Sequence, residues 1–332
     1  MSEHLLDIRD LHVSFFTPAG EVKAVNGISY TLERGKVLGV VGESGSGKSV
    51  SVNALMQMIE YPGKITGGDI EFDDKEILSF NQKQMRKIRG KDIGMIFQDP
   101  MTSLNPVYTI GNQMMEGLRL HMGMNKKQAY ERGVEMLALV GVNNPERRMK
   151  QYPHEFSGGM RQRAMIAMTL ACEPKLLIAD EPTTALDVTI QAQILDLMKE
   201  LRTKINSAIL LITHNLGIVS DLCDDVIVLY GGKIVESGSI RDIFYRPAHP
   251  YTVGLLRCLP RLDSDGKEPL IPIEGTPIDQ LSLPEGCAFA PRCERCMKVC
   301  IRQQPPAYAF DEGHTSACWL HWKKDQQKEQ TP

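Results

Sequence analysis

Short apolar runs and helical patterns alternate along the N-terminal part of this chain. Residues 5–16 and 22–32 are rich in β-favouring residues and flank the turn-prone segment 17–20, which predicts an antiparallel hairpin. An apolar strand at residues 36–41 leads into a glycine-rich loop, and residues 48–59 have a helical pattern. The first sixty residues therefore predict a hairpin followed by a strand-loop-helix unit.

The middle of the chain changes its pattern twice. Residues 82–152 read as mainly helical, because apolar residues recur there at helical spacing. Strand, helix and strand patterns then follow at residues 176–179, 190–201 and 208–213. This order predicts parallel strands joined by right-handed crossovers, as in α/β folds.

The last third begins with a hairpin pattern and then loses its periodicity. Residues 226–230 and 233–236 flank Gly231-Gly232, which predicts a two-residue turn. After about Pro247 the proline content rises and regular patterns fade. The predicted organisation is a main domain over residues 1–250, a helical subdomain within it at about 100–160, and an extension over residues 251–332.

Composition narrows the class of protein. The chain has 332 residues, 42% of them hydrophobic, and a formal net charge of -3, which gives no basic field for nucleic acid. Its apolar runs fall far short of the roughly 20 residues that cross a bilayer. Residues 1–10 carry Glu3, Asp7 and Asp10 and lack a secretory pattern, so the chain is expected to stay in the cytoplasm.

The glycine-rich loop matches the phosphate-binding pattern G-x-x-x-x-G-K-[ST] in full, between a predicted strand and a predicted helix. Its glycines let backbone N–H groups face phosphates, and the helix N-terminus adds positive potential. Lys48 is expected to reach the outer phosphates of ATP and Ser49 to bind Mg²⁺. A structural glycine turn is the alternative, which the context disfavours. The predicted nucleotide-binding residues here are Gly42, Glu43, Ser44, Gly45, Ser46, Gly47, Lys48, Ser49 and Val50.

Two carboxylates, Asp180 and Glu181, end the strand at residues 176–179. The carboxyl edge of a parallel sheet is where open α/β folds bind ligands. Asp180 is expected to hold Mg²⁺ through its water shell and Glu181 to act as general base for the attacking water. An acidic pair taken alone is more often a solvated strand end, and the phosphate loop upstream is what favours the functional interpretation.

The segment Ser157-Gly158-Gly159 resembles the signature of ATP-binding cassette (ABC) ATPases, with Met160 where the commonest signature has Gln. The resemblance covers nearly the whole chain and implies an α/β P-loop NTPase fold: a RecA-like parallel core, an antiparallel β subdomain, a helical subdomain and here a Cys-rich extension. P-loop kinases and GTPases lack this signature. The resemblance further implies a dimer enclosing two nucleotides, with Ser157, Gly158 and Gly159 serving the partner's ATP.

Other positions match the same family. The resemblance implies that Gln98 is the Q-loop residue and a Mg²⁺ contact beside Ser49 and Asp180. It also implies that Asp187 belongs to the D-loop, and that His214 is the switch histidine. Phe15, or alternatively Phe16, falls where the family places an aromatic ring on adenine, and core packing of a strand phenylalanine is the simpler alternative.

Residues 95–106 and 246–252 closely resemble the ATPase subunits of dipeptide and oligopeptide importers. The resemblance implies a second, F-type ATPase as partner, two transmembrane permease subunits, an extracellular peptide-binding protein and a peripheral position at the cytoplasmic face of the membrane. Nickel or antimicrobial-peptide transport, and a non-transport ABC ATPase, are the alternatives. Because other subunits recognise the substrate, this sequence does not choose among dipeptides, longer oligopeptides, nickel and antimicrobial peptides.

Five of the eight cysteines lie between Cys287 and Cys318. Four thiolates suit tetrahedral zinc and an iron–sulfur cluster equally well. The spacing of four of them is similar to the arrangement that holds a [4Fe-4S] cluster in these importer ATPases, while Cys296 interrupts it and leaves one ligand assignment open. Loss of the metal is expected to unfold the extension and spare the phosphate loop. The implied ligands are Cys287, Cys293, Cys300 and Cys318.

Overall fold

The computed structural model describes residues 4–99, 103–182, 188–205, 207–259, 272–311 and 313–322. The chain divides into two compact units. The first consists of Met1–Leu6, Leu32–Val37 and Phe72–Ile212, and the second of Asp7–Thr31, Leu38–Glu71 and Thr213–Pro332.

Parallel strands form the centre of the first unit. β6 pairs with β7, and β7 with β8, so that Ile178 lies opposite Met95 on one side and Leu210 on the other. Every residue of these three strands is buried, as expected for parallel strands covered on both faces. In chain order the unit contains β5 (Lys75–Glu76), α2 (Gln82–Ile88), β6 (Ile93–Ile96), α4 (Ile110–Met122), α5 (Lys126–Leu139), α6 (Pro145–Arg148), the 3₁₀ turn Pro153–Glu155, α7 (Gly158–Leu170), β7 (Leu176–Asp180), α8 (Val188–Ile205) and β8 (Ala208–Thr213).

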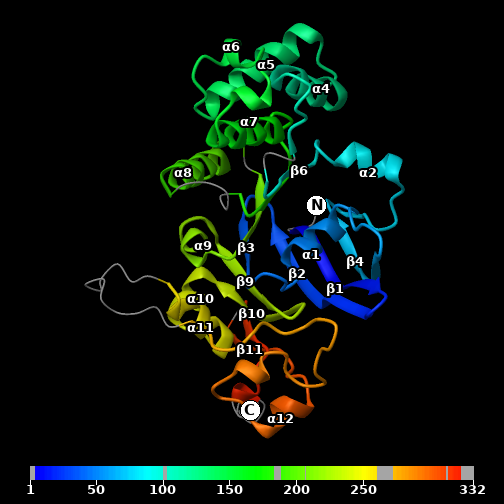
Figure 1. The fold of residues 1–332 in the computed structure, drawn as a ribbon, viewed down its shortest axis with the longest axis vertical. Helices are drawn as coiled ribbons and strands as arrows, with labels where there is room; N and C mark the ends of the chain where they lie inside the picture. Colours follow the sequence, from blue (N-terminus) through cyan, green and yellow to red (C-terminus); the bar gives the residue numbers. More distant parts are fainter. Residues whose placement is uncertain are drawn as a thin grey trace, which may run out of the picture. The chain divides into compact units, whose positions relative to one another are not determined.

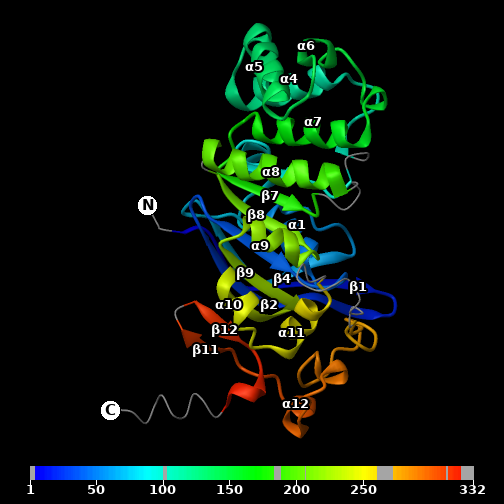
Figure 2. The same ribbon diagram turned by 90° about the vertical axis from the view of Figure 1, so that its left-hand side faces the viewer.

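The helices of this unit begin at side chains that cap them. Asn81 and Asn125 form capping boxes at α2 and α5, and Thr109 and Ser157 accept hydrogen bonds from the first turns of α4 and α7. In Figures 1 and 2, α4, α5, α6 and α7 lie together. The helices α4, α5 and α6 lie within the predicted helical segment at residues 82–152, whereas α7 lies beyond it.

The second unit contains an antiparallel sheet and a mixed sheet. β2, β1 and β4 are neighbours in the first, and the two-residue turn between β1 and β2 forms the predicted hairpin. In the second sheet β3 pairs parallel with β9, while β9, β10, β12 and β11 pair antiparallel (Figure 2). In chain order the unit contains β1 (His4–Thr17), β2 (Gly20–Glu33), β3 (Val37–Val41), α1 (Lys48–Leu55), β4 (Gly63–Phe72), α9 (Leu216–Leu222), β9 (Asp225–Tyr230), β10 (Lys233–Ser239), α10 (Ile240–Tyr245), α11 (Pro250–Arg257), α12 (Lys298–Arg302), β11 (Tyr308–Asp311) and β12 (His314–Ser316), with 3₁₀ turns at Ala290–Arg292 and Trp319–His321.

Several elements differ from the prediction. β6 lies inside the segment predicted as mainly helical, because a fully buried run of four residues has no period of its own. β4 was not predicted, since Gly67 and Gly68 interrupt its pattern. The helix expected to reach residue 59 ends at Leu55. No helix among the described residues has the length and apolarity that a membrane span requires.

The burial of β7 yields a stability prediction. Ile178→Ala removes a fully buried side chain and should lower the free energy of unfolding by about 2–5 kcal/mol, measured by urea denaturation. The control is Leu120→Ala on α4, where the side chain is 73% exposed and the change should stay within about 0.5 kcal/mol. Equal losses in the free energy of unfolding for the two substitutions would contradict the burial of β7 in the core of the first unit.

Candidate active site

The phosphate loop joins β3 to α1 in the second unit, so the predicted strand-loop-helix arrangement is present. Lys48 opens α1 and is only 4% exposed. Its Nζ donates hydrogen bonds to the carbonyl oxygens of Gly42 and Glu43, each at 2.8 Å. Of the other loop residues, Ser44 and Gly45 are exposed, Ser46 and Gly47 are buried, and Ser49 and Val50 are half-buried.

Two glycines allow this loop to touch neighbouring backbone. Gly42 has φ 154°, and a Cβ there would lie 2.3 Å from the carbonyl oxygen of Leu229 in β9. Gly47 has φ 101°, and a Cβ there would lie 2.3 Å from the carbonyl oxygen of Ala24 in β2. Both positions therefore require glycine for space as well as for backbone conformation.

Residues of the C-terminal region also contact the loop. Tyr251 accepts a hydrogen bond from the Glu43 N–H at 2.8 Å, and Gln280 Nε2 donates to the Gly45 carbonyl at 2.7 Å. Arg292 donates to both carboxylate oxygens of Glu43, at 2.6 and 3.0 Å, and this raises the pKa of the arginine. These three contacts are not predictable from the sequence, since an arginine or a glutamine in a proline-rich segment belongs to no recognisable motif.

The acidic pair lies at the carboxyl end of β7 in the first unit. Asp180 is the last residue of the strand and is 7% exposed. Glu181 follows with φ 46°, and its N–H donates to the Ile212 carbonyl oxygen at 2.9 Å. Gln98, two residues beyond β6, donates from Nε2 to Glu181 Oε2 at 2.9 Å. The structure therefore brings Gln98 and Glu181 into direct contact at one edge of the sheet.

The signature segment forms the start of α7. Ser157 is the N-cap residue, and its hydroxyl accepts a hydrogen bond from the Met160 N–H at 3.4 Å. Ser157 and Gly158 are exposed, and a Cβ on Gly158 would meet nothing within 4 Å. The helix therefore presents an accessible N-terminus, where backbone N–H groups and the helix dipole favour an anion.

Phe15 lies near the end of a strand, and His214 directly follows one. His214 follows β8 and is exposed. Phe15 is half-buried, and its ring lies so close to Gly63 that a Cβ there would be 2.7 Å from it, whereas Phe16 is 47% exposed. Asp187 lies outside the described residues.

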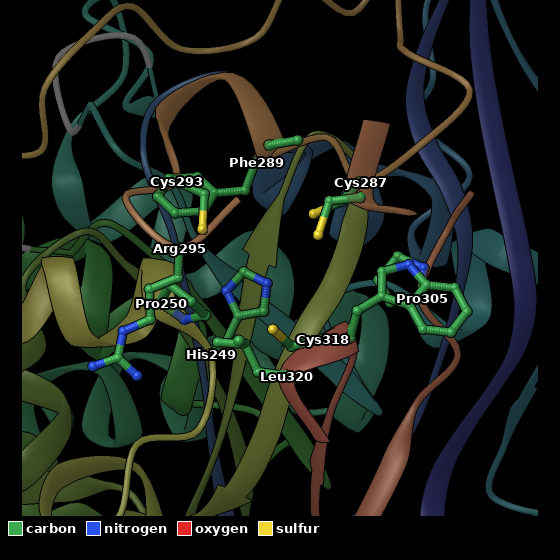
Figure 3. Close-up of a pocket in the computed structure, with 12 residues that line it drawn as sticks. His249, Pro250, Cys287, Phe289, Cys293, Arg295, Pro305, Cys318 and Leu320 are labelled. Atoms are coloured by element: carbon green, nitrogen blue, oxygen red, sulfur yellow. The ribbon is translucent and has the colours of Figure 1, made fainter. Parts of the chain in front are cut away.

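Four cysteines of the extension line one small cavity of about 10 Å³, together with His249 and Phe289. Figure 3 shows the sulfur atoms of Cys287, Cys293 and Cys318 facing a common space beside the His249 ring. Burial lowers the pKa of His249 to about 3, so this ring is neutral at physiological pH. The four cysteines are Cys287, Cys293, Cys300 and Cys318.

The four cysteines of this cavity form no disulfide bonds. Burial raises the pKa of Cys287 and of Cys318 to about 11. Cys296 is exposed and does not line the cavity, although its thiol has a hydrogen-bond contact with Cys300. Within the described ranges no set of three or more His, Cys, Asp or Glu side chains is arranged around a single metal position.

Two family models match the chain. One, described as ABC transporter, matches residues 25–184, and the other, described as the C-terminal region of oligopeptide/dipeptide transporters, matches residues 235–300. The first contains the phosphate loop, Gln98, the signature and the acidic pair. The second contains Tyr251, Arg292 and four of the five clustered cysteines.

Solved structures support the same fold. The ATP-binding cassette MJ0796, in a dimeric post-hydrolysis state bound to ADP and Pi, superposes with a TM-score of 0.64 at 25% identity, covering 71% of this chain and 99% of that one. The cbiO1 protein of Clostridium perfringens, part of an ABC transporter complex, gives a TM-score of 0.62 at 27% identity, covering 76% of this chain and 96% of that one.

Sequence relatives extend over nearly the whole chain. The oligopeptide transport ATP-binding protein OppD of Salmonella typhimurium is 53% identical over 95% of this chain and 93% of its own length. The dipeptide transport ATP-binding protein DppD of Bacillus subtilis is 53% identical over 96% of this chain and 95% of its own. The chain therefore belongs to the ATP-binding proteins of ABC transporters and is an ABC transporter ATPase of the group that contains OppD and DppD.

Proposed function

We propose that this chain is the ATP-hydrolysing subunit of an importer that carries dipeptides or longer oligopeptides through partner permease subunits. The observation that carries the proposal is the 53% identity to both OppD and DppD over at least 95% of the chain. The match of residues 235–300 to the transporter C-terminal region supports it. Nickel and antimicrobial-peptide transport are the alternatives within this family.

Uptake by cells that lack this chain tests the proposal. Wild-type chain should restore uptake of labelled di- and tetrapeptides, and a Glu181→Gln chain should not. Restored nickel uptake without peptide uptake would replace peptide with nickel as the substrate. Peptide uptake that is normal in the absence of the chain would contradict the proposal altogether.

The proposal assigns roles at the nucleotide site. The phosphate loop holds the phosphates, Phe15 stacks on adenine, and Ser49, Gln98 and Asp180 hold Mg²⁺. Glu181 would activate the attacking water, His214 would act as the switch histidine, and Asp187 would contribute from the D-loop. The hydrogen bond between Gln98 and Glu181 supports the hydrolytic part, because it keeps the proposed magnesium contact beside the proposed base.

Glu181→Gln should leave ATP binding intact and slow hydrolysis by about 10²- to 10⁴-fold, because the carboxylate is needed for the water and not for the nucleotide. The measurement is phosphate release by the assembled complex, alongside direct ATP binding. Glu131→Gln, an exposed glutamate on α5, is the matched control and should hydrolyse ATP normally. Near-normal ATP hydrolysis by the Glu181→Gln variant would show that Glu181 is not the general base.

We further propose that the chain pairs with a second, F-type ATPase, each presenting its signature to the other's nucleotide. The accessible N-terminus of α7, capped by Ser157, supports this arrangement, since it offers amides to an anion outside its own unit. Two permease subunits and an extracellular peptide-binding protein complete the proposed assembly, with this chain at the cytoplasmic face of the membrane.

Ser157→Arg should preserve nucleotide binding at this chain's own phosphate loop and impair hydrolysis at the site that its partner completes. The measurement compares ATP binding to the single chain with hydrolysis by the assembled pair. Ser79→Arg, on an exposed turn before α2, supplies the same charge as a control. If Ser157→Arg abolished binding to the isolated chain, the signature would not act across an interface.

The cysteine cavity is the proposed site of a [4Fe-4S] cluster. The donor chemistry fits, because four thiols from one segment of the chain line the same space and Cys296 does not. Zinc stays the alternative, since four thiolates suit either group. A cavity of about 10 Å³ has room for roughly one water, so a cluster would need more space than this cavity has. The cluster would act as a structural staple for a segment with little core of its own.

Anaerobically prepared protein should be brown and contain about four irons per chain, with matching sulfide, by elemental analysis. Cys293→Ser should lose the iron, whereas Cys296→Ser should retain it. Stoichiometric zinc without iron or sulfide would contradict the cluster. Loss of iron in Cys296→Ser together with retention in Cys293→Ser would contradict the ligand set.

A further inference from the structure

Arg292 connects the cysteine-rich extension to the phosphate loop. It directly precedes Cys293, and its side chain is only 5% exposed. Besides its two bonds to Glu43, it donates from Nε to the Glu274 carbonyl at 3.0 Å, and from Nη2 to the Ile273 carbonyl at 3.2 Å. Its fifth bond goes from Nη1 to the Tyr230 hydroxyl at 3.4 Å. These bonds use all five N–H donors of a guanidinium, so the side chain is fully committed.

An aromatic cluster surrounds this connection. Phe289, which lies between Cys287 and Arg292, is 3% exposed and contacts Tyr230 and Tyr251 with ring centroids 5.2 and 5.3 Å apart. The Arg292 guanidinium lies 5.9 Å from the centre of the Tyr230 ring. The same tyrosines contact the loop or the arginine, so the extension and the loop share one packed contact region within the second unit.

The negative charge of Glu43 is unfavourable in a phosphate-binding loop. It stands in a loop whose proposed ligand carries several negative charges, and its carboxylate is one-quarter exposed. An unpaired carboxylate there would repel phosphates, whereas a bidentate arginine pair neutralises it and fixes its direction. The Glu43 N–H is held by Tyr251 and its carbonyl by Lys48, so a shift of this residue would also shift Lys48.

We propose that Arg292 is a positioning residue for the phosphate loop: it neutralises Glu43 and makes nucleotide affinity depend on the folded extension. This inference rests on the proposed role of the loop as the nucleotide site. It changes the expectation that the extension can unfold without effect on ATP binding. The connection belongs to this chain alone and needs no partner subunit.

Binding of Mg-AMP-PNP to the full-length chain, measured by calorimetry, tests the inference. Arg292→Met should weaken binding about tenfold, within the range measured for coupled charge pairs. Glu43→Gln supplies the reference affinity of a loop without the carboxylate, because removing the carboxylate removes the repulsion. The double variant should recover the affinity of Glu43→Gln. Arg302→Met, an exposed arginine on α12, is the matched control and should not change binding.

The double variant separates positioning from a general loss of fold. If Arg292→Met weakened binding only by unfolding the extension, Glu43→Gln would not restore it, and the inference would be wrong. Unchanged binding by Arg292→Met would also overturn it. Lys48→Ala keeps the two proposals distinct. If Lys48→Ala binds Mg-AMP-PNP like wild type, the nucleotide site itself is misplaced, whereas a loss of binding there confirms the site and leaves the Arg292 variants to test the positioning role.

Discussion

Close backbone contact at the phosphate loop is the constraint on which the second unit depends. Gly42 lies against the Leu229 carbonyl in β9, and Gly47 against the Ala24 carbonyl in β2, with no room for a Cβ at either place. The Ser46 carbonyl in turn accepts a hydrogen bond from the Gly232 N–H at 3.1 Å. The loop is thus held by both sheets of its unit through backbone atoms.

This arrangement explains why residues of the C-terminal extension contribute to the shape of the phosphate loop. A loop that gathers N–H groups for an anion also contains Glu43, whose charge opposes that purpose. The compensating cation comes from Arg292, almost 250 residues later in the chain, and lies beside a proposed metal ligand. Because Tyr251 and Gln280 hold the same loop, three separate points of the C-terminal region contribute to its shape. The division of the chain at residue 250 remains a prediction.

The sequence predicted the parts of the fold that have a strong local pattern. The phosphate loop, both hairpins, and the parallel strands β7 and β8 followed from periodicity and turn residues, and the structure confirms them. β6 was not recognisable, since four buried residues fit a helix as well as a strand. The hydrogen bond from Gln98 to Glu181 joins residues 83 positions apart, and that from Arg292 to Glu43 spans 249. A local sequence pattern cannot predict contacts between residues so far apart in the chain. These residues become neighbours only when the chain folds.

The backbone at Glu181 shows how the sheet supports the proposed catalytic residue. A glutamate with φ 46° occupies the left-handed region, which costs a non-glycine residue about 1–3 kcal/mol. The conformation is kept because the Glu181 N–H is bonded to the Ile212 carbonyl of the adjacent strand. This turn ends the strand immediately after Asp180. The carboxylates of Asp180 and Glu181 therefore need not point to opposite faces of the sheet, as successive residues of a strand do. The Glu181 carboxylate then meets Gln98 at the end of β6, on the other side of β7 from the strand that holds its backbone. Residues of three neighbouring strands thus fix the Glu181 side chain. The hydrogen bonds between β7 and β8 compensate for the backbone strain at Glu181.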